Sequence, residues 1–352
     1  MVVPLRAAKN SSKMTYKTII SGHLEFGSNR SYEKVMSMLD HRIENYYKND
    51  VLINIEEVFQ EDTSAMDIPR LIGQASDKCF RNTLSMVEMI MQYAVAGTVH
   101  IWKLEGGKCL EHHKLEPNSD KAAIKSFLKG RELIKAGKKK EARTSFSKAI
   151  EKFERHALAY ERRGHINYLL NNIDDALYDF NKSLQINPNS PVAYFGRGTI
   201  HMHRGHFAEA EADFGAAAKG SIPHQPIYWK ARREKGACHL ELSQYKEAAF
   251  EFKLLSNRTF EKSDINYAFK QKDLFNYGRA LLGLKDFDAA IEAFDKALNV
   301  KEEQEEEAIP KADRLLYRGI ALQKAGKDGY RNDWQLAADS GSEKAAQLLQ
   351  EG

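Results

Sequence analysis

The sequence predicts a mainly α-helical protein in which a small α+β domain is followed by an array of repeated helical hairpins. After residue 120, a pattern of small and aromatic residues recurs with a period of 34 residues, and later with somewhat larger spacings. Before residue 117 this period is absent, and segments rich in β-branched residues alternate with amphipathic segments. These two observations place a mixed domain in front of a repeat array.

The composition is that of an ordinary folded protein. The 352 residues are 42% hydrophobic and 29% charged, which excludes wholesale disorder and a fibrous architecture. A chain of this length suggests about two domains. The net charge of +4 is too small to indicate a nucleic-acid partner by itself, so any electrostatic argument must be local.

Several function classes receive no support from the sequence. Cys79, Cys109 and Cys238 are odd in number and include no CxxC pair, which disfavours a zinc site and a disulfide framework. No segment has the uninterrupted apolar length of a membrane span. Residues 1–13 lack the apolar core of a secretory signal, and we expect them to form a disordered leader. We therefore expect a cytoplasmic protein with neither a metal nor a cofactor.

The repeat unit has three recurring positions. Gly130, Gly164 and Gly198 lie 34 residues apart, an alanine follows each glycine after twelve residues, and a phenylalanine follows that alanine after four. The same frame occurs twice more, and a sixth unit starts at Gly319. The five complete frames are Gly130, Ala142, Phe146; Gly164, Ala176, Phe180; Gly198, Ala210, Phe214; Gly236, Ala248, Phe252; and Gly278, Ala290, Phe294.

This pattern resembles the tetratricopeptide repeat, a helical hairpin with small residues at the helix crossing and an aromatic residue packed against them. In the second unit, Tyr160 and Pro188 also occupy typical positions of the family. The resemblance implies a right-handed α-solenoid over residues 121–338, with five full repeats and a degenerate sixth. Residues 339–352 are expected to form a polar capping helix.

The later units depart from the 34-residue period. The extra residues fall near 221–229, near 256–269 and in the acidic run 301–307, and we expect longer helices or loops there. The sixth unit also has Arg331 where the alanine is expected, which predicts a shortened second helix.

Residues 14–116 are expected to form the α+β domain, and 117–119 the junction. The sequence predicts a strand in TYKTIISGHLEF, a helix from Ser31 to about Lys48, and another helix in ASDKCFRNTLSMVEMIMQYAVA. Residues 50–59 fit either a strand or a helix. The segment GTVHIWKLEGGKCLEHHKLEP predicts a hairpin that turns at Gly106 and Gly107 and whose edge docks on the first repeat helix.

Histidine and glutamate residues raise the alternative of a metal or acid-base site in this domain. His23 and Glu25 share a strand face, and His41 and Glu44 share a helix face. No known catalytic motif accompanies these two pairs, so we expect no catalytic residues. His112 and His113 are expected on opposite faces of a strand and therefore cannot chelate one ion.

The tract HMHRGH contains a second group of histidines. His201 and His203 diverge around a helix, so only His203 and His206 could meet, across the end of that helix near Gly205. Two ligands do not define a metal site.

The resemblance assigns a binding groove to the first helix of each repeat. The residues expected to line it as a peptide-binding surface are Phe127, Arg131, His165, Tyr168, Phe195, Lys230, Arg233, Lys272, Phe275 and Arg279.

This groove predicts a non-catalytic protein-interaction scaffold that binds an extended, acidic peptide or partner. Its basic residues in the fourth and fifth units are suited to carboxylates, and its aromatic residues to an apolar anchor. The alternatives are that the front domain folds into the groove, or that the acidic run 301–307 neutralises it. An enzyme or sensor in residues 14–116 and an RNA-binding solenoid are two further alternatives.

Tetratricopeptide proteins that hold the carboxylate tail of a chaperone use a clamp of lysine, asparagine and arginine residues. The corresponding places here hold Phe127, Arg131, Arg162, Val192 and Gly196, so the clamp is absent.

Overall fold

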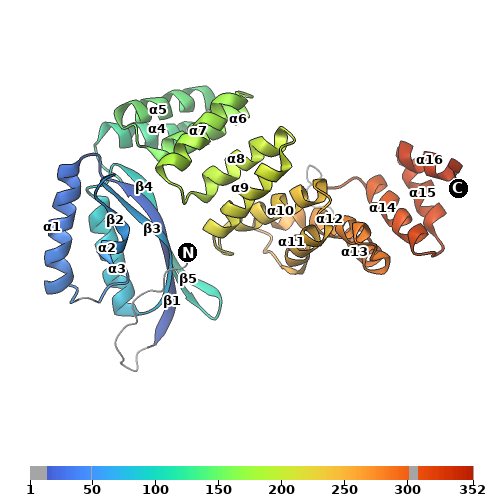
Figure 1. The fold of residues 1–352 in the computed structure, drawn as a ribbon, viewed down its shortest axis with the longest axis horizontal. Helices are drawn as coiled ribbons and strands as arrows, with labels where there is room; N and C mark the ends of the chain where they lie inside the picture. The colour runs from blue at the N-terminus through green and yellow to red at the C-terminus, as the bar shows by residue number, and fades with distance from the viewer. Residues whose placement is uncertain (1–13, 49, 301–307, 352) are drawn as a thin grey trace. The chain divides into compact units, whose positions relative to one another are not determined.

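A computed structural model describes residues 14–48, 50–300 and 308–351. It confirms a mainly helical protein with a five-stranded antiparallel sheet at the N-terminal end (Figure 1). The chain divides into two compact units, residues 1–197 and 198–352, and the division falls within one helix. The predicted leader 1–13 and acidic run 301–307 lie outside the described residues.

The N-terminal domain is a sheet with helices packed against one face. Its strand order is β2-β3-β1-β4-β5, and all neighbouring strands are antiparallel. The elements are β1 (Thr15–Glu25), α1 (Asn29–Asn45), α2 (Ile55–Val58), β2 (Phe59–Gln60), β3 (Ala65–Ser76), α3 (Asp77–Met91), β4 (Ala96–Glu105) and β5 (Lys108–Leu115).

Alternation along the strands decides which side chains enter the core of this domain. Ile20 and Leu24 of β1 and Ile101 of β4 are buried in one cluster with Val35 of α1 and Ile90 of α3. Side chains at the intervening positions of β1 therefore point away from these helices. Among them is the pair His23 and Glu25.

The predicted strand, helices and hairpin are all present, and β5 follows β4 through Gly106 and Gly107, both with positive φ. The ambiguous segment 50–59 becomes a loop and the short helix α2, before β2 begins. Strand β3 was not predicted, because Pro69 interrupts its pattern. Pro69 lies where the pairing of β1 with β3 shifts register between Ile20 and Gly22, a position at which a proline is tolerated.

The docked edge predicted for the hairpin is only partly seen. Residues 108–112 of β5 are exposed, and just after the end of this strand Glu116 contacts Arg131 of the first repeat. The exposed edge carries Lys108, Lys114 and a bulge, which disfavour pairing with another strand.

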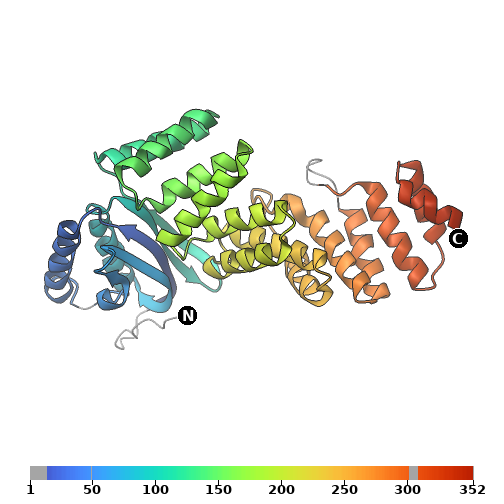
Figure 2. The same cartoon turned by 45° about the horizontal axis from the view of Figure 1, so that its top comes forward.

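Six helical hairpins follow the sheet domain. The described pairs are α4 (Ala122–Lys135) with α5 (Lys139–Lys152), α6 (Ala157–Leu169) with α7 (Ile173–Ile186), α8 (Pro191–His203) with α9 (Phe207–Gly220), α10 (Pro226–Glu241) with α11 (Tyr245–Asn257), α12 (Lys270–Gly283) with α13 (Phe287–Asn299), and α14 (Lys311–Lys324) with α15 (Tyr330–Asp339). The one-turn helix η1 (Tyr267–Phe269) precedes α12, and α16 (Glu343–Glu351) ends the array. Figure 2 shows these hairpins in chain order.

The recurring glycine and phenylalanine meet where the two helices of a hairpin cross. A Cβ atom added to Gly278 would lie 2.6 Å from the ring of Phe294, and one added to Gly236 would lie 2.9 Å from that of Phe252. The five repeat phenylalanines are buried, and the five repeat alanines are completely inaccessible. The helices therefore approach closely enough that only glycine fits.

The sixth hairpin has a tryptophan instead of a phenylalanine at this contact. Trp334 takes the place of the phenylalanine, and a Cβ atom on Gly319 would lie 2.6 Å from its ring. Helix α15 has only 10 residues, and α16 packs on it through Ala345.

The turn inside each hairpin has a second periodic feature. Seven residues after each recurring glycine, the backbone has a positive φ. Asn171, Ser243 and Lys285 adopt this φ, although residues with a side chain rarely do. The first, third and sixth hairpins have Gly137, Gly205 and Gly326 there. This left-handed residue ends the first helix in the same place in every hairpin.

We expect Gly278→Ala to destabilise the protein by about 1 to 3 kcal/mol, because the new methyl group overlaps Phe294. Gly215→Ala is the matched control. It lies inside α9, where an added Cβ atom would come no closer than 3.8 Å to other atoms, so it should stabilise by about 0.5 to 1 kcal/mol. Denaturant unfolding of the two variants measures both changes, and a loss of stability in both would contradict the explanation.

Candidate functional site

The first helices of the hairpins, α4, α6, α8, α10, α12 and α14, carry the residues predicted to bind a peptide. The structure places these residues in three different environments. Some contact the sheet domain of the same chain, some are buried between hairpins, and some remain partly exposed.

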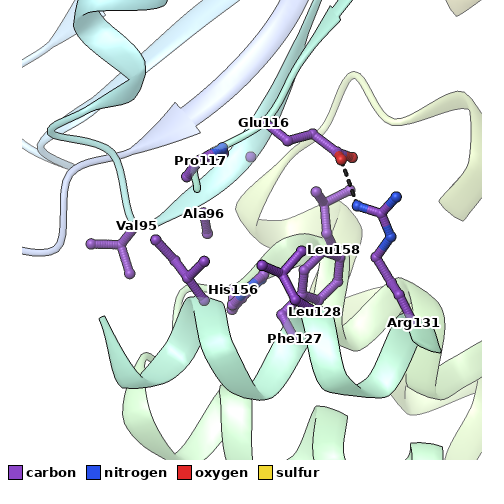
Figure 3. A pocket seen from close by; sticks show the side chains of 11 residues that line it. Val95, Ala96, Glu116, Pro117, Phe127, Leu128, Arg131, His156 and Leu158 are labelled. Atoms are coloured by element: carbon purple, nitrogen blue, oxygen red, sulfur yellow. Dashed lines mark hydrogen bonds and ion pairs between the residues drawn. The ribbon is translucent and has the colours of Figure 1, made fainter. Parts of the chain in front are cut away.

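On the first hairpin, the predicted groove faces the sheet domain. A small pocket separates Val95, Ala96 and Pro117 on the sheet side from Phe127 and Leu158 on the helices (Figure 3). Phe127 is buried, and its ring lies 4.8 Å from that of His156. The alternative in which the front domain occupies the groove therefore applies at Phe127 and Leu158.

Arg131 is held by the sheet domain as well. Its Nη1 atom lies 2.5 Å from Oε2 of Glu116, as the dashed line in Figure 3 shows. Burial raises the pKa of Glu116, but Lys114 and Arg131 outweigh that effect, so its pKa is lowered overall. Phe127 and Arg131 are thus engaged by their own chain, which corrects their assignment to a partner.

Two further polar contacts join the sheet to loops between the hairpins. Glu25 of β1 accepts hydrogen bonds from Nε and Nη2 of Arg155 at 2.9 and 2.8 Å. Asp67 of β3 accepts hydrogen bonds from Nδ2 of Asn189 at 3.0 and 3.2 Å. Both repeat residues lie just before a first helix, α6 or α8.

Three further residues predicted to bind a peptide lie on the first helices of the second and third hairpins, α6 and α8. His165 of α6 is exposed, whereas Tyr168 of α6 and Phe195 of α8 are half-buried. Their role in binding a partner stays a prediction.

Arg233 was predicted to face a ligand but is 2% exposed and enclosed by its own repeats. Its Nε and Nη2 atoms donate to the two carboxylate oxygens of Asp273 at 2.6 and 2.9 Å, and Nη1 donates to Asn266 at 3.1 Å. Its guanidinium also lies 4.2 Å from the ring of Phe269. The inserted residues before α12 therefore help to bury Arg233, and we remove it from the candidate ligand contacts.

Phe275 is also part of the interior. It is 5% exposed and packs against Phe294 and Tyr317, with ring centroids 5.6 and 5.3 Å away. Its side chain fills space between α12, α13 and α14, so the predicted apolar contact with a partner is wrong at this residue.

Three predicted cations of the fourth and fifth hairpins remain partly exposed. Lys230 on α10 and Lys272 on α12 are half-buried, and Lys272 lies 5.8 Å from the ring of Phe269. Arg279 on α12 retains 33% side-chain exposure and reaches Glu241 at 3.8 Å and Asn276 at 3.3 Å. Because Glu241 is itself exposed, its ion pair with Arg279 is weak.

The histidine clusters do not assemble a metal site within the described residues, where no group of three potential ligands is close enough. His23 and Glu25 share a face of β1 as predicted, but His41 and Glu44 are exposed on α1, which packs on the other face of the sheet. The two pairs therefore do not form one site.

The neighbouring histidines of β5 point to opposite faces of the sheet, as predicted. His112 stacks on Trp102 and hydrogen-bonds to His100, whereas His113 lies beside Phe80.

In the HMHRGH tract, the structure shows a contact between His201 and His206 that the sequence did not predict. The ring of His206 lies 6.1 Å from that of His201, because the backbone N–H of His206 returns to the carbonyl of His201 at the helix end. His203 is exposed on the same helix.

A recurring ion pair across the hairpins was not predicted. Arg163 donates to both carboxylate oxygens of Asp179, at 3.0 and 2.7 Å, and Arg318 does the same to Asp333, at 2.7 and 2.6 Å. In the fourth hairpin, Lys235 lies 3.3 Å from Glu251. The signal was visible as a cation directly before the small glycine and an acid directly before the aromatic residue.

Comparison with known proteins adds sequence similarity to this geometry. Residues 127–191 and 195–253 match one family model described as tetratricopeptide repeat, and residues 274–304 match a second with the same description.

No helix among the described residues has the length and apolar character to span a bilayer.

Two of the curated proteins similar to this chain match it over part of its length. It is 27% identical over 148 residues to the bovine (Bos taurus) protein SGT1 homolog, covering 36% of this chain and 43% of that protein. It is 32% identical over 92 residues to tetratricopeptide repeat protein 13 of Homo sapiens, covering 26% of this chain and 11% of that protein. The chain thus spans less than half the length of either relative.

Solved structures show similar arrangements of helices at low identity. YrrB, a tetratricopeptide repeat protein with an unusual peptide-binding site, is 18% identical, with a TM-score of 0.49 over 59% of this chain and 98% of that chain. PilW, a type IV pilus biogenesis factor, is 20% identical, with a TM-score of 0.45 over 66% of this chain and 100% of that chain.

We expect Arg233→Met to lower the free energy of unfolding by about 3 to 5 kcal/mol, because it leaves the Asp273 carboxylate buried without its cation. Lys230→Met on the same helix removes a cation from a less buried position and should change stability little. The double variant Arg233→Met with Asp273→Leu should recover most of the loss. Denaturant unfolding measures all three, and equal losses at residues 230 and 233 would contradict the buried pair.

Proposed function

Because the chain carries tetratricopeptide repeats, we propose that it is a non-catalytic protein-interaction scaffold whose fourth and fifth repeats bind an extended acidic segment of a partner. Proteins of this repeat class generally mediate protein–protein interactions. The acidic character of the segment is our own inference from the residues of α10 and α12.

The partly exposed cations Lys230, Lys272 and Arg279 are the observation that supports this proposal. They lie on the first helices of two successive repeats, and α10 and α12 contact each other. Cations on adjoining helices attract a carboxylate-bearing ligand. Arg279 is suited to a carboxylate in particular, because its exposed partner Glu241 is easily replaced.

The first two repeats contribute less to such a site. Phe127 and Arg131 already contact the sheet domain, and Arg155 is bound by Glu25. In the fourth and fifth repeats, Lys230, Lys272 and Arg279 define the proposed binding surface, and we call it the basic surface.

Catalysis in the sheet domain receives no comparable support. His23 and Glu25 are buried, and the second carboxylate near His23, Asp67, is bound by Asn189. These groups are occupied by contacts within the chain. Binding of RNA remains the competing hypothesis for a basic surface and is tested below.

The test uses an array of short peptides in which every acidic sequence is paired with its glutamine and asparagine counterpart. The wild-type protein should bind acidic members and discriminate against the amide versions. Reversing Lys230, Lys272 and Arg279 to glutamate should weaken binding by roughly 10- to 150-fold for each charge-assisted hydrogen bond lost, which corresponds to about 1.5 to 3 kcal/mol.

The matched control reverses Lys246, Lys253 and Lys296, which are exposed on the second helices α11 and α13. It changes the net charge equally and should leave peptide binding intact. Helix content and melting of both variants are checked by circular dichroism. Equal weakening in the two triple variants, or equal binding of acidic and amide peptides, would reject the acidic-ligand hypothesis, whereas binding of oligouridylate with a steep salt dependence would favour RNA.

A further inference from the structure

The first helical hairpin carries more positive charge than the whole chain. Residues 121–152, which contain α4 and α5, include eleven Lys or Arg residues and three Glu residues, which gives a net charge of +8. The complete chain has a net charge of only +4, so the residues outside this hairpin sum to −4. The excess of positive charge is therefore a local property of the first hairpin.

Some of these cations have partners within the chain. Nζ of Lys121 donates to the carbonyl groups of Tyr93 and Ala94, and Arg131 is bound by Glu116. Four others have a carboxylate within 3.9 Å, namely Lys125, Lys135, Lys138 and Lys152. The described part of the chain offers no ion pair to the remaining five, which are Lys129, Lys139, Lys140, Arg143 and Lys148.

Four of these five cations lie on one helix, α5, and we call them the α5 patch. They are Lys139, Lys140, Arg143 and Lys148. The three lysines are exposed and Arg143 is half-buried. At a rise of about 1.5 Å per residue, the patch extends over roughly 14 Å of the helix.

Comparison with the other second helices shows that the repeat fold does not need this charge. Helix α5 contains five Lys or Arg residues and two Glu residues, a net charge of +3. By the same count, α7, α9, α11, α13 and α15 have net charges between −2 and 0. All six helices occupy equivalent places in their hairpins, so the positive charge belongs to α5 in particular.

The start of α5 also departs from what helix stability favours. Positive charge near a helix N-terminus opposes the helix dipole, whereas acidic residues there complement it. The first turns of α7, α9 and α13 carry acidic residues. Helix α5 instead begins with Lys139 and Lys140, and Glu141 is the acid in its first turn. Folding of the helix therefore does not account for these two lysines.

We propose that the α5 patch is a sequence-independent binding site for the phosphate backbone of double-stranded nucleic acid. A duplex carries one negative charge per about 1.7 Å of its axis, so it presents roughly eight charges along the length of the patch. Lysine and arginine side chains that contact phosphates hold a protein on a duplex without reading its bases. This site lies on a different helix from the basic surface and does not depend on the proposed peptide binding.

The chemistry of the patch favours a duplex over the other polyanions. Proteins that bind single strands stack bases on aromatic side chains in a groove. Helix α5, which is described throughout, exposes no aromatic or large aliphatic side chain. Its apolar residues Ala142, Phe146 and Ala149 are buried in the hairpin, so they cannot enter a lipid layer as the apolar face of a membrane-bound helix does.

The first measurement is the binding of the full-length wild-type protein to a fluorescently labelled DNA duplex of mixed sequence, followed by anisotropy. If four phosphates are neutralised, the logarithm of the association constant should fall with the logarithm of the salt concentration with a slope of about −3.6. Affinity should then fall roughly 100-fold between about 50 and 200 mM salt. Absence of duplex binding at the lower salt concentration, or an affinity independent of salt, overturns the proposal.

The second measurement repeats this titration with the four residues of the α5 patch changed to glutamine. Each phosphate contact that is lost lowers the slope by about 0.9, so the slope should approach zero. A triple variant, Lys139→Gln with Lys140→Gln and Lys148→Gln, changes exposed residues only and should lower the slope by about 2.7. Circular dichroism checks that both variants keep the helix content and melting of the wild type.

The matched control changes four exposed lysines on other second helices to glutamine, namely Lys219, Lys246, Lys253 and Lys296. It alters the net charge as much as the quadruple α5 variant does and should keep the wild-type affinity and slope. Equal losses in the two quadruple variants would attribute binding to net charge and overturn the proposal.

Three further comparisons separate the α5 patch from other sites and partners. Reversal of the basic surface to glutamate should leave duplex binding intact, and loss of binding there would assign the nucleic acid to the fourth and fifth repeats instead. Oligouridylate and vesicles that contain phosphatidylserine should both bind more weakly than the duplex. Tighter binding of either one, removed by the α5 changes, would identify a single strand or a membrane as the partner and overturn the proposal.

Discussion

The contact between a glycine and an aromatic ring sets the geometry on which the repeat region depends. Each first helix must approach its partner closely enough that a single methyl group on Gly130, Gly236 or Gly278 overlaps a phenylalanine. Close approach fixes the crossing of the two helices, and the crossing fixes which side chains point outward from the first helix. The contact lies inside the hairpin, so connections between hairpins can vary in length without disturbing it.

The variable connections show how an insertion becomes part of the interior. The residues added before α12 supply Asn266 and Phe269, which surround the guanidinium of Arg233 together with Asp273. The Asp273 carboxylate is almost completely buried, and burial raises its pKa more than the cations lower it. Removing Arg233 is therefore expected to destabilise the protein more than its predicted position on the groove surface suggests.

Charge distribution separates the two parts of the repeat region. In the first two repeats, Arg131 and Arg155 bind carboxylates of the sheet domain. In the fourth and fifth repeats, Lys230, Lys272 and Arg279 retain exposure. The same repeat architecture thus presents an internally occupied face near the sheet and, by our proposal, a basic surface for a partner further along the chain.

The sequence by itself determined the elements whose residues act through local contacts. The spacing of glycine, alanine and phenylalanine predicted the hairpins, because the helix period places those residues at one crossing. The paired glycines 106 and 107 likewise predicted a turn that needs positive φ, and alternation on β1 placed His23 beside Glu25. The left-handed turn at Lys285 escaped prediction, because its residue type does not reveal its conformation.

Only the tertiary structure decided which candidate residues face outward. Arg233 and Lys230 are equivalent cations in the sequence, but one is buried by Asp273, which lies 40 residues further along the chain. Phe275 is enclosed by rings from two other helices, and Phe127 and Arg131 are covered by a domain that carries no repeat signal. Strand β3 was not predicted from the sequence for a related reason. The bulge that accommodates Pro69 exists only through the pairing of β3 with β1. Periodicity reports the face on which a side chain lies, whereas burial and ion pairing depend on segments that meet only when the chain folds.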